Sequence, residues 1–249
     1  MTITGSHALV TGGGSGIGRS IALALADAGV EVTICGRRRE ALDAVDHPRV
    51  HGVVADVTDP ASIAALYETA QAARGPFDIV IANAGAAMSA PAARVTLDDW
   101  QASLAVNLTG AFLSVQPAIA PMTKAGCGRI VFIASTAGLK GYAYVAPYVA
   151  AKHGVVGLMR ALAAETAKSG ITVNAVCPGF AETEMLTRSL DAIAAKTGRS
   201  EEEARAALAN PQGRFVTPEE VAAAVLWLVS DGAGSVTGQA ISVSGGETW

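Results

Sequence analysis

The chain has 249 residues, of which 51% are apolar and 16% are charged. This composition supplies a large hydrophobic core and excludes a disordered chain. The formal net charge of −4 gives no electrostatic reason to bind nucleic acid or an anionic membrane. The three cysteines stand in apolar runs. Their odd number disfavours a disulfide framework and predicts a reducing, cytoplasmic location.

Short β-branched runs alternate with longer alanine- and leucine-rich segments along the chain. The expected strands are His7–Thr11, Glu31–Cys35, Val50–Ala55, Asp78–Ala82, Arg129–Ala134, Ile171–Val176 and Ala240–Val243. The expected helices are Gly18–Ala28, Ser62–Ala73, Leu97–Ala118, Tyr148–Ser169 and Pro218–Val229. Continuously apolar strands suit a sheet covered on both faces. The alternation predicts an α/β protein with one Rossmann-type domain over residues 1–249, a doubly wound parallel sheet of about seven strands and helices on both faces.

Two segments depart from the regular alternation. Residues 101–123 carry no charge and are long enough to span a bilayer, but their polar residues and two prolines favour a helix buried by its own domain or by a second subunit. Residues 183–215 form the least regular stretch, and their polar middle predicts an added surface helix pair that serves as a substrate lid. The first residues show no signal peptide.

A glycine-rich turn follows the first expected strand. Residues 11–18 read TGGGSGIG, which places Gly12, Gly16 and Gly18 in G-x-x-x-G-x-G spacing around Ser15 and Ile17. A strand, a glycine turn and a helix allow the backbone to approach a pyrophosphate and direct helix N–H groups at it. A tight strand-to-helix connection would use the same residues. The position after the first strand favours a dinucleotide site.

The end of the second expected strand distinguishes NADP(H) from NAD(H). An acidic residue there would bind the ribose 2′-hydroxyl and repel a 2′-phosphate. This chain has Gly36 followed by Arg37, whose planar guanidinium fits a phosphate. NADP(H) is therefore favoured. Ser15 stands where a second basic residue would strengthen phosphate binding, and Arg38 and Arg39 could simply solvate a helix start, so NAD(H) stays open.

A candidate catalytic group lies in the second half of the chain. Tyr148 and Lys152 are four residues apart on one expected helix, so they share a face. A cation beside a tyrosine stabilises the phenolate and lowers its pKa toward the working range. Ser135 follows a strand end, where a hydroxyl can reach a substrate carbonyl. A tyrosine and a lysine at this spacing are common by chance, but their combination with Ser135 and the glycine turn is specific.

These motifs resemble the short-chain dehydrogenase/reductase family over nearly the whole chain, in particular its 3-oxoacyl thioester reductases and 3-hydroxyacyl dehydrogenases. The matching residues are Thr11 to Gly18, Asp56, Asn83-Ala84-Gly85, Asn107, Ser135, Tyr148, Lys152, Pro178-Gly179 and Thr183. The resemblance implies an oxidoreductase that interconverts a ketone and a secondary alcohol by hydride transfer. It also implies a homotetramer with a small-molecule substrate.

The resemblance also implies residue roles. Tyr148 would be the general acid/base, Lys152 would lower its pKa and hold the nicotinamide ribose, and Ser135 would polarise the carbonyl. Asn107 would order a water chain from Lys152. The remaining implied cofactor contacts are Asp56 and Val57 at the adenine, Asn83, Ala84 and Gly85 beside the cofactor, and Pro178, Gly179 and Thr183 around the nicotinamide and its phosphates.

The substrate class is an expectation drawn from two stretches. Residues 148–180 look like polyketide ketoreductases, and residues 185–215 look like 3-hydroxybutyrate dehydrogenases and 3-oxoacyl thioester reductases. A 3-oxoacyl/3-hydroxyacyl substrate, as a thioester, is therefore favoured. The alternative is an NAD-dependent catabolic dehydrogenase of a 3-hydroxy acid or of a cyclic or aromatic secondary alcohol. A nucleotide-sensing regulator is disfavoured because Ser135, Tyr148 and Lys152 are all present.

Several other residues receive plainer interpretations. Cys177 is expected to fill the core, and His153 to pack or face solvent. His7, His47 and His51 lack the spacing of metal ligands, so no catalytic metal is expected. A burial of Trp249 against a neighbouring subunit and its exposure are weighed equally.

Overall fold

A single parallel sheet forms the centre of the protein. The structure, a computed structural model, describes residues 2–198 and 200–248. The strands are β1 (His7–Thr11), β2 (Glu31–Gly36), β3 (Val50–Val54), β4 (Ile79–Ala82), β5 (Gly128–Ile133), β6 (Ile171–Pro178) and β7 (Ala240–Val243). Their order is β3-β2-β1-β4-β5-β6-β7. The winding reverses between β1 and β4, and in such sheets ligands bind at the carboxyl ends of the strands beside that point. The predicted doubly wound Rossmann fold is confirmed.

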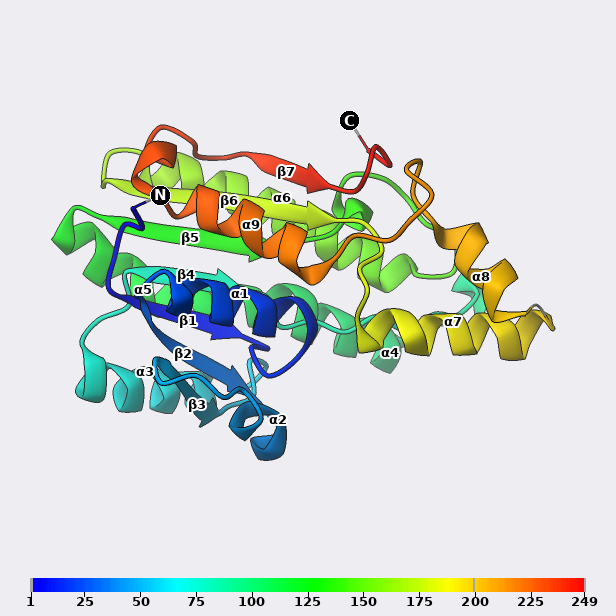
Figure 1. The fold of residues 1–249 in the computed structure, drawn as a ribbon, viewed down its shortest axis with the longest axis horizontal. Helices are drawn as coiled ribbons and strands as arrows, with labels where there is room; N and C mark the ends of the chain where they lie inside the picture. The colour runs from blue at the N-terminus through cyan, green and yellow to red at the C-terminus, as the bar shows by residue number, and fades with distance from the viewer. Residues whose placement is uncertain (1, 199, 249) are drawn as a thin grey trace.

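Helices cover both faces of the sheet. They are α1 (Gly16–Asp27), α2 (Arg39–Asp43), α3 (Pro60–Arg74), α4 (Leu97–Leu104), α5 (Gly110–Ala125), α6 (Ala146–Thr166), α7 (Glu184–Thr197), α8 (Glu201–Leu208) and α9 (Pro218–Leu228). Figure 1 shows α1 and α9 side by side on one face, with α3, α4, α5 and α6 on the other. α7 and α8 extend beyond the carboxyl ends of the strands.

The two faces of the sheet bury two separate apolar layers, because successive side chains of a strand point to opposite faces. On β1, Leu9 joins the layer under α3, α5 and α6, whereas Ala8 and Val10 join the layer under α1 and α9. On β5, Phe132 and Val131 divide in the same way. The continuously apolar strands of the sequence are therefore the strands that need cover on both sides.

The observed elements differ from the expected ones mainly at their ends and in one helix. The strand β1 and the strand β7 have the expected bounds, and the other expected strands are displaced by one or two residues at an end. The helix expected over Leu97–Ala118 continues to Ala125 and contains a π-helical segment at Ala105–Thr109. The short helix α2 is absent from the expected helices, since five residues are too few to show a helical period, but it begins at the helix start considered for Arg38 and Arg39.

The charge-free segment forms one continuous helical stretch, Leu97–Ala125. By length and composition alone this stretch could cross a membrane, with 39% of its most apolar window buried. Its inner face packs against β4, β5, α3 and α6. Its outer face leaves Leu97, Trp100 and Phe112 exposed. Burial by its own domain therefore holds for one face, and the predicted alternative, contact of the other face with a second subunit, stays a prediction.

The segment expected as a surface helix pair forms α7 and α8. The two helices enclose a small apolar cluster made of Leu186, Leu190, Ala204 and Phe215. This cluster is separate from both layers of the sheet. The pair therefore has a small core of its own, attached to the domain through Phe215 and the segment after β6. Trp249, weighed as a subunit contact, lies outside the described residues.

Candidate active site

The glycine turn has a backbone conformation and a close packing that favour glycine. Gly12 and Gly16 have positive φ of 65° and 50°, a conformation that favours glycine. A Cβ on Gly18 would lie 2.3 Å from the Gly12 carbonyl oxygen. Ser15 caps α1 with extended backbone and makes no side-chain cap bond, so the first N–H groups of α1 have no side-chain acceptor. Such a helix N-terminus suits an anionic phosphate.

The segment after β4 is bonded to the end of β1. The hydroxyl of Thr11 accepts hydrogen bonds from the backbone N–H groups of Asn83 and Ala84, both at 3.0 Å. The Asn83 amide donates to the carbonyls of Thr11 at 2.8 Å and Gly12 at 3.3 Å. These bonds join the two strands that flank the winding reversal. Asn83 therefore ties the segment after β4 to the start of the glycine turn.

A cleft of about 600 Å³ opens at the carboxyl ends of these strands. Of the predicted cofactor residues, the structure places Gly12, Ser15, Arg37, Asp56, Val57, Ala84 and Gly85 in its lining. Gly14, Arg38, Thr58, Met88, Asp99 and Ser103 also line it, and sequence reasoning missed them. Ligand pockets commonly have volumes of this size. The glycine turn, the uncapped helix and the cleft together fit a dinucleotide.

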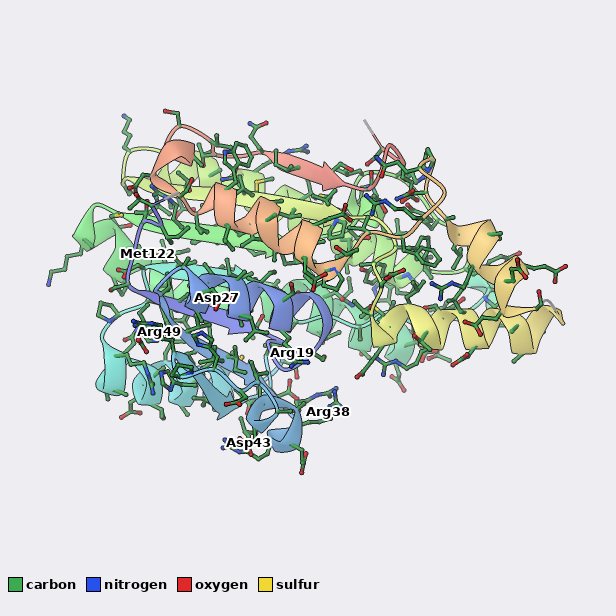
Figure 2. The ribbon with its side chains drawn as sticks, in the orientation of Figure 1. Arg19, Asp27, Arg38, Asp43, Arg49 and Met122 are labelled. Carbon is green, nitrogen blue, oxygen red and sulfur yellow. The ribbon has the colours of Figure 1, made fainter. Side chains whose placement is uncertain are left out.

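Two arginines face one end of the cleft. Arg37 and Arg38 follow β2, are exposed, and both line the cleft. Figure 2 shows Arg38 at the start of α2 and Arg19 near the start of α1, both at the carboxyl-end edge of the sheet. Arg39 instead donates to the Gly52 carbonyl at 3.2 Å and pairs with Asp43 at 3.6 Å. Arg38 and Arg39 were both considered as residues that only solvate a helix start. Arg38 lines the cleft, and Arg39 does not.

Asp56 follows the edge strand β3 and lines the same cleft as these arginines. Its Oδ1 accepts hydrogen bonds from the Thr58 backbone at 2.9 Å and from the Thr58 hydroxyl at 2.8 Å. Those two bonds, with a smaller contribution from the charge of Arg37, hold the pKa of Asp56 below its usual value. Both bonds go to the same oxygen. Asp56 is therefore a fixed, ionised acceptor on the cleft wall.

Ser135 and Tyr148 meet at the carboxyl end of β5. Ser135 starts a short 3₁₀ turn, Thr136–Gly138, and its hydroxyl accepts a hydrogen bond from the Ala137 N–H at 3.1 Å. Tyr148 stands in the first turn of α6, close enough to Ser135 for the Ser135 side chain to lower the pKa of its phenol. Both residues keep part of their surface exposed. The two hydroxyl groups can therefore contact the same substrate oxygen.

Lys152 and Asn107 both lie close to Gly85. Lys152 is 4% exposed and donates from Nζ to the Ile133 carbonyl at 2.8 Å. A Cβ on Gly85 would lie 3.7 Å from this Nζ and 2.8 Å from Oδ1 of Asn107. The Asn107 amide donates to the carbonyls of Ala86 and Ser103. Asn107 stands in the π-helical segment, a deviation that often occurs at functional sites.

The electrostatics of this cluster differ from the expectation in one respect. The sequence predicted that Lys152 lowers the pKa of Tyr148. In the free protein burial raises the pKa of Tyr148, and the hydrogen bond from Ser135 opposes that rise. Burial also lowers the pKa of Lys152 to about 8. Nζ of Lys152 lies 5.6 Å from the centre of the Tyr148 ring and is bonded to a backbone carbonyl, so desolvation outweighs its charge.

The segment after β6 closes the other side of the glycine turn. Pro178 ends β6, and the Gly179 N–H donates to the Val243 carbonyl at 3.0 Å. Thr183 starts α7, and its Cγ2 would lie 3.1 Å from a Cβ on Gly16. Thr183 is therefore in contact distance of the turn although 167 positions separate the two residues (183 − 16). Thr183 therefore lies beside the glycine turn, although neither it nor Pro178 and Gly179 are among the residues that line the cleft.

Two residues given plainer interpretations lie as expected. Cys177 is fully buried, and burial raises the pKa of its thiol to about 11. His153 is exposed and its Nδ1 lies 2.9 Å from the Val149 carbonyl oxygen. Sequence reasoning missed Tyr142, whose hydroxyl lies 2.7 Å from that of Thr136. Its position seven residues after Ser135 carried no recognisable signal.

In the described part of the chain, no group of three His, Cys, Asp or Glu side chains is placed to hold a metal ion.

A Rossmann fold with this cleft and this tyrosine, lysine and serine cluster defines an NAD(P)-dependent oxidoreductase that acts on CH–OH groups. The chain belongs to the short chain dehydrogenase family, whose model matches residues 6–194. It is 38% identical over 250 residues to a 3-oxoacyl-acyl-carrier-protein reductase of Salmonella typhimurium, an alignment that covers 99% of this chain and 98% of that protein.

Two further likenesses support the same class. A D-beta-hydroxybutyrate dehydrogenase of Cupriavidus necator is 38% identical over 253 residues, covering 98% of each chain. The crystal structure of a variant of actinorhodin polyketide ketoreductase with NADPH superposes with a TM-score of 0.94 at 39% identity, covering 97% of each chain. The family, the fold and the ketone–alcohol reaction are therefore established for this chain.

Proposed function

We propose that the protein is an NADP(H)-dependent oxidoreductase that interconverts 3-oxoacyl and 3-hydroxyacyl thioesters. The observation that carries this proposal is the continuity of the site: the Gly85 backbone, which lines the cleft, lies next to both Lys152 and Asn107. Gly85 therefore stands between the cleft that Arg37 lines and Lys152 of the proposed catalytic cluster.

The division of labour follows from the positions of these groups. When bound, the nicotinamide cofactor supplies or accepts the hydride. Tyr148 donates a proton to the carbonyl oxygen as that oxygen becomes an alkoxide, and Ser135 stabilises the same developing charge. Lys152 carries a positive charge at neutral pH, because its pKa of about 8 lies above 7. Asn107, bonded to the backbone of Ala86, holds the wall beside Lys152 in place.

The remaining residues are assigned to cofactor binding. Gly12, Ser15, Gly16, Ile17 and Gly18 hold the pyrophosphate at the start of α1, and Asp56 and Val57 hold the adenine. Pro178, Gly179 and Thr183 enclose the nicotinamide end of the cofactor. Residues 183–215, which contain α7 and α8, act as a lid over the substrate. The support for these assignments is their common position around one edge of the sheet.

The preference for NADP(H) rests on charge. Arg37 and Arg38 both line the cleft at the end of β2, and no acidic residue stands between β2 and these arginines. A 2′-phosphate would gain two cationic partners there, whereas the end of β2 itself offers no carboxylate to a ribose hydroxyl. The solved actinorhodin ketoreductase variant contains NADPH. We therefore propose NADP(H) as the working cofactor.

The thioester preference rests on relatives and on one ion pair. A 3-oxoacyl carrier-protein reductase and a polyketide ketoreductase are similar to this chain. Lys140, on the loop after Ser135, is already paired with Glu247 at 3.2 Å. It therefore offers no free cation to the carboxylate of an unesterified 3-hydroxy acid. The alternative, a dehydrogenase of free 3-hydroxy acids using NAD(H), is favoured by the likeness to D-beta-hydroxybutyrate dehydrogenase.

The test measures initial rates of acetoacetyl-CoA reduction with NADPH and with NADH, and of 3-hydroxybutyrate oxidation with NADP⁺ and NAD⁺. We expect turnover of the thioester with NADPH and at least a thousandfold loss in Tyr148→Phe, on the order reported for loss of a proton donor and its charge stabilisation. Faster oxidation of 3-hydroxybutyrate with NAD⁺ would replace the proposal with the alternative.

Arg37→Gln tests the cofactor assignment separately. Loss of a phosphate-binding guanidinium should raise the Kd of NADPH about tenfold and leave the Kd of NADH nearly unchanged. Intrinsic fluorescence titration measures both constants. Arg39→Gln is the matched control, because Arg39 lies outside the cleft lining. Equal effects on both cofactors would show that Arg37 contacts the adenine and not a 2′-phosphate.

The proposal extends to assembly and location. The exposed side chains of Leu97, Trp100 and Phe112 make an apolar outer face on the Leu97–Ala125 stretch. A chain that left such a face in water would associate readily. A homotetramer in the cytoplasm, built on this face, fits the family expectation and the three unpaired cysteines.

A further inference from the structure

The C-terminal segment 244–248 follows β7 and contacts both the loop after Ser135 and the segment after β6. Figure 1 shows the segment after β7 beyond the carboxyl ends of β6 and β7, near the loop between α8 and α9. Glu247 is the charged residue of this segment, and its side chain is 14% exposed. Nothing in the proposed mechanism uses it, so its burial beside the site needs another explanation.

Glu247 is linked to the residue after Ser135 through one tyrosine. The hydroxyl of Tyr142 donates to Oε1 of Glu247, and the same hydroxyl lies 2.7 Å from the hydroxyl of Thr136. Thr136 directly follows Ser135. Burial, and then the hydrogen bond with Glu247, raise the pKa of Tyr142 above 10, and the nearby phenol of Tyr148 contributes. Tyr142 therefore remains a neutral donor between the C-terminus and the catalytic cluster.

A cation and an aromatic ring complete the contact. Lys140 pairs with Oε1 of Glu247 at 3.2 Å and lies 4.9 Å from the centre of the Tyr142 ring. The Tyr142 ring also meets Phe180 edge to face, with ring centres 6.2 Å apart. Both the loop after Ser135 and the segment after β6 are therefore tied to the same carboxylate and tyrosine.

The same C-terminal segment touches two other parts of the site's border. A Cβ on Gly179 would lie 2.8 Å from Oε2 of Glu247. A Cβ on Gly245 would lie 2.3 Å from Nδ2 of Asn210, which stands where the lid segment returns to the domain. Side chains at these two glycines would collide with their neighbours, so the close approach depends on glycine. Three segments that are distant in sequence thus converge on the chain end.

We infer that Glu247 is a positioning residue that acts through Tyr142 to fix the wall of the substrate pocket, a wall formed by the Tyr142 and Phe180 rings. This inference rests on the proposed function, because it requires a ketone to bind beside Ser135 and Tyr148. The carboxylate contacts neither reacting atom; it orients Tyr142 and neutralises Lys140. Its loss therefore weakens ketone binding more than it slows the bound reaction.

The test is a double-mutant cycle of Tyr142→Phe and Glu247→Ala, with kcat and KM measured for acetoacetyl-CoA and for cyclohexanone. Each single variant should raise the KM of the ketone roughly tenfold, since one charge-assisted hydrogen bond is lost, and should change kcat less than about threefold. The double variant should resemble the single ones, because both remove the same link. Glu247→Gln, which keeps an oxygen that can accept from Tyr142, should recover part of the loss.

Hydrogen exchange of residues 139–144 gives a second readout that needs no turnover. Exchange there should become faster in Glu247→Ala and stay unchanged at β1, whereas Glu165→Gln, the same charge change on the exposed surface of α6, should have no effect. Additive KM effects, a fall in kcat at constant KM, or unchanged exchange would overturn the inference. If the wild-type protein reduces neither ketone, the substrate proposal fails, and the exchange result still decides whether Glu247 holds this wall.

Discussion

The single residue Lys152 destabilises the folded protein but is required by the proposed reaction. An ammonium that is 4% exposed loses most of its hydration, and one carbonyl, that of Ile133, replaces only part of it. The lowered pKa of about 8 expresses this cost. This loss of folding stability has a functional reason in the proposed mechanism, because the charge is needed when Tyr148 exchanges its proton. Charged groups placed in active sites often have this effect.

We expect Lys152→Met to abolish turnover and to raise the free energy of unfolding of the free protein by about 1–2 kcal/mol at pH 7. The sign follows from the pKa, which is lowered from 10.5 to about 8 by folding. Below pH 8 lysine is charged in both the folded and the unfolded protein, so the full cost applies. Between pH 8 and 10.5 only the unfolded lysine remains protonated, and the gain disappears as the pH rises.

Urea unfolding of both proteins at pH 7 and at pH 10 measures this difference. The gain should be clear at pH 7 and mostly lost at pH 10. Lys168→Met, at an exposed lysine just past the end of α6, is the control for a general effect of removing a positive charge. A destabilised Lys152→Met at pH 7 would mean that the bond to Ile133 outweighs the desolvation of the ammonium.

The helix pair α7 and α8, proposed above as a lid, packs on a cluster of its own at the scale of the element. α7 and α8 pack on their own cluster, and Phe215, 5% exposed, is its largest side chain. The ring also lies 5.0 Å from the Arg205 guanidinium. The sequence showed that a helix pair was present, because its polar middle interrupts an apolar chain. It did not show that the pair encloses a separate core.

Phe215→Ala should open α7 and α8 without unfolding the sheet. Removal of a buried phenylalanine costs about 3–5 kcal/mol of stability. We expect this loss to exceed the free energy by which a cluster of four side chains stabilises the helix pair against local opening. Hydrogen exchange of residues 184–208 should become faster while β1 and β5 keep their protection. Phe112→Ala, which removes an exposed ring on α5, should leave the lid unchanged. Loss of protection in the whole sheet would show that the lid and the domain unfold together.

At the scale of the whole molecule, the outer face of the Leu97–Ala125 stretch exposes three large apolar side chains, Leu97, Trp100 and Phe112. We expect the wild-type protein to sediment as a tetramer and Phe112→Glu to sediment as a smaller species, because a charge would be desolvated in the contact. Sedimentation velocity over a range of concentrations measures both. Glu68→Lys, at an exposed position of α3, is the control. A monomeric wild-type protein would contradict the assembly proposed above.

Many features of this protein could be read from neighbouring residues alone. The strands, the glycine turn, Gly36 with Arg37, and the pairing of Tyr148 with Lys152 depend on spacings of a few residues, which the chain's own geometry converts into structure. The family resemblance then indicated which distant residues belong to one site. Of the residues so named, the structure places a large part in or beside one cleft.

Only the tertiary structure decided the contacts between segments that are far apart in the chain. Thr11 and Asn83 are 72 residues apart and meet because β1 and β4 are neighbours in the sheet. Tyr142 and Glu247 are 105 residues apart and meet because β5, β6 and β7 end at the same edge. The raised pKa of Tyr148 and the lowered pKa of Lys152 also belong here. Desolvation depends on every atom packed around a group, and no local pattern in the sequence records that packing.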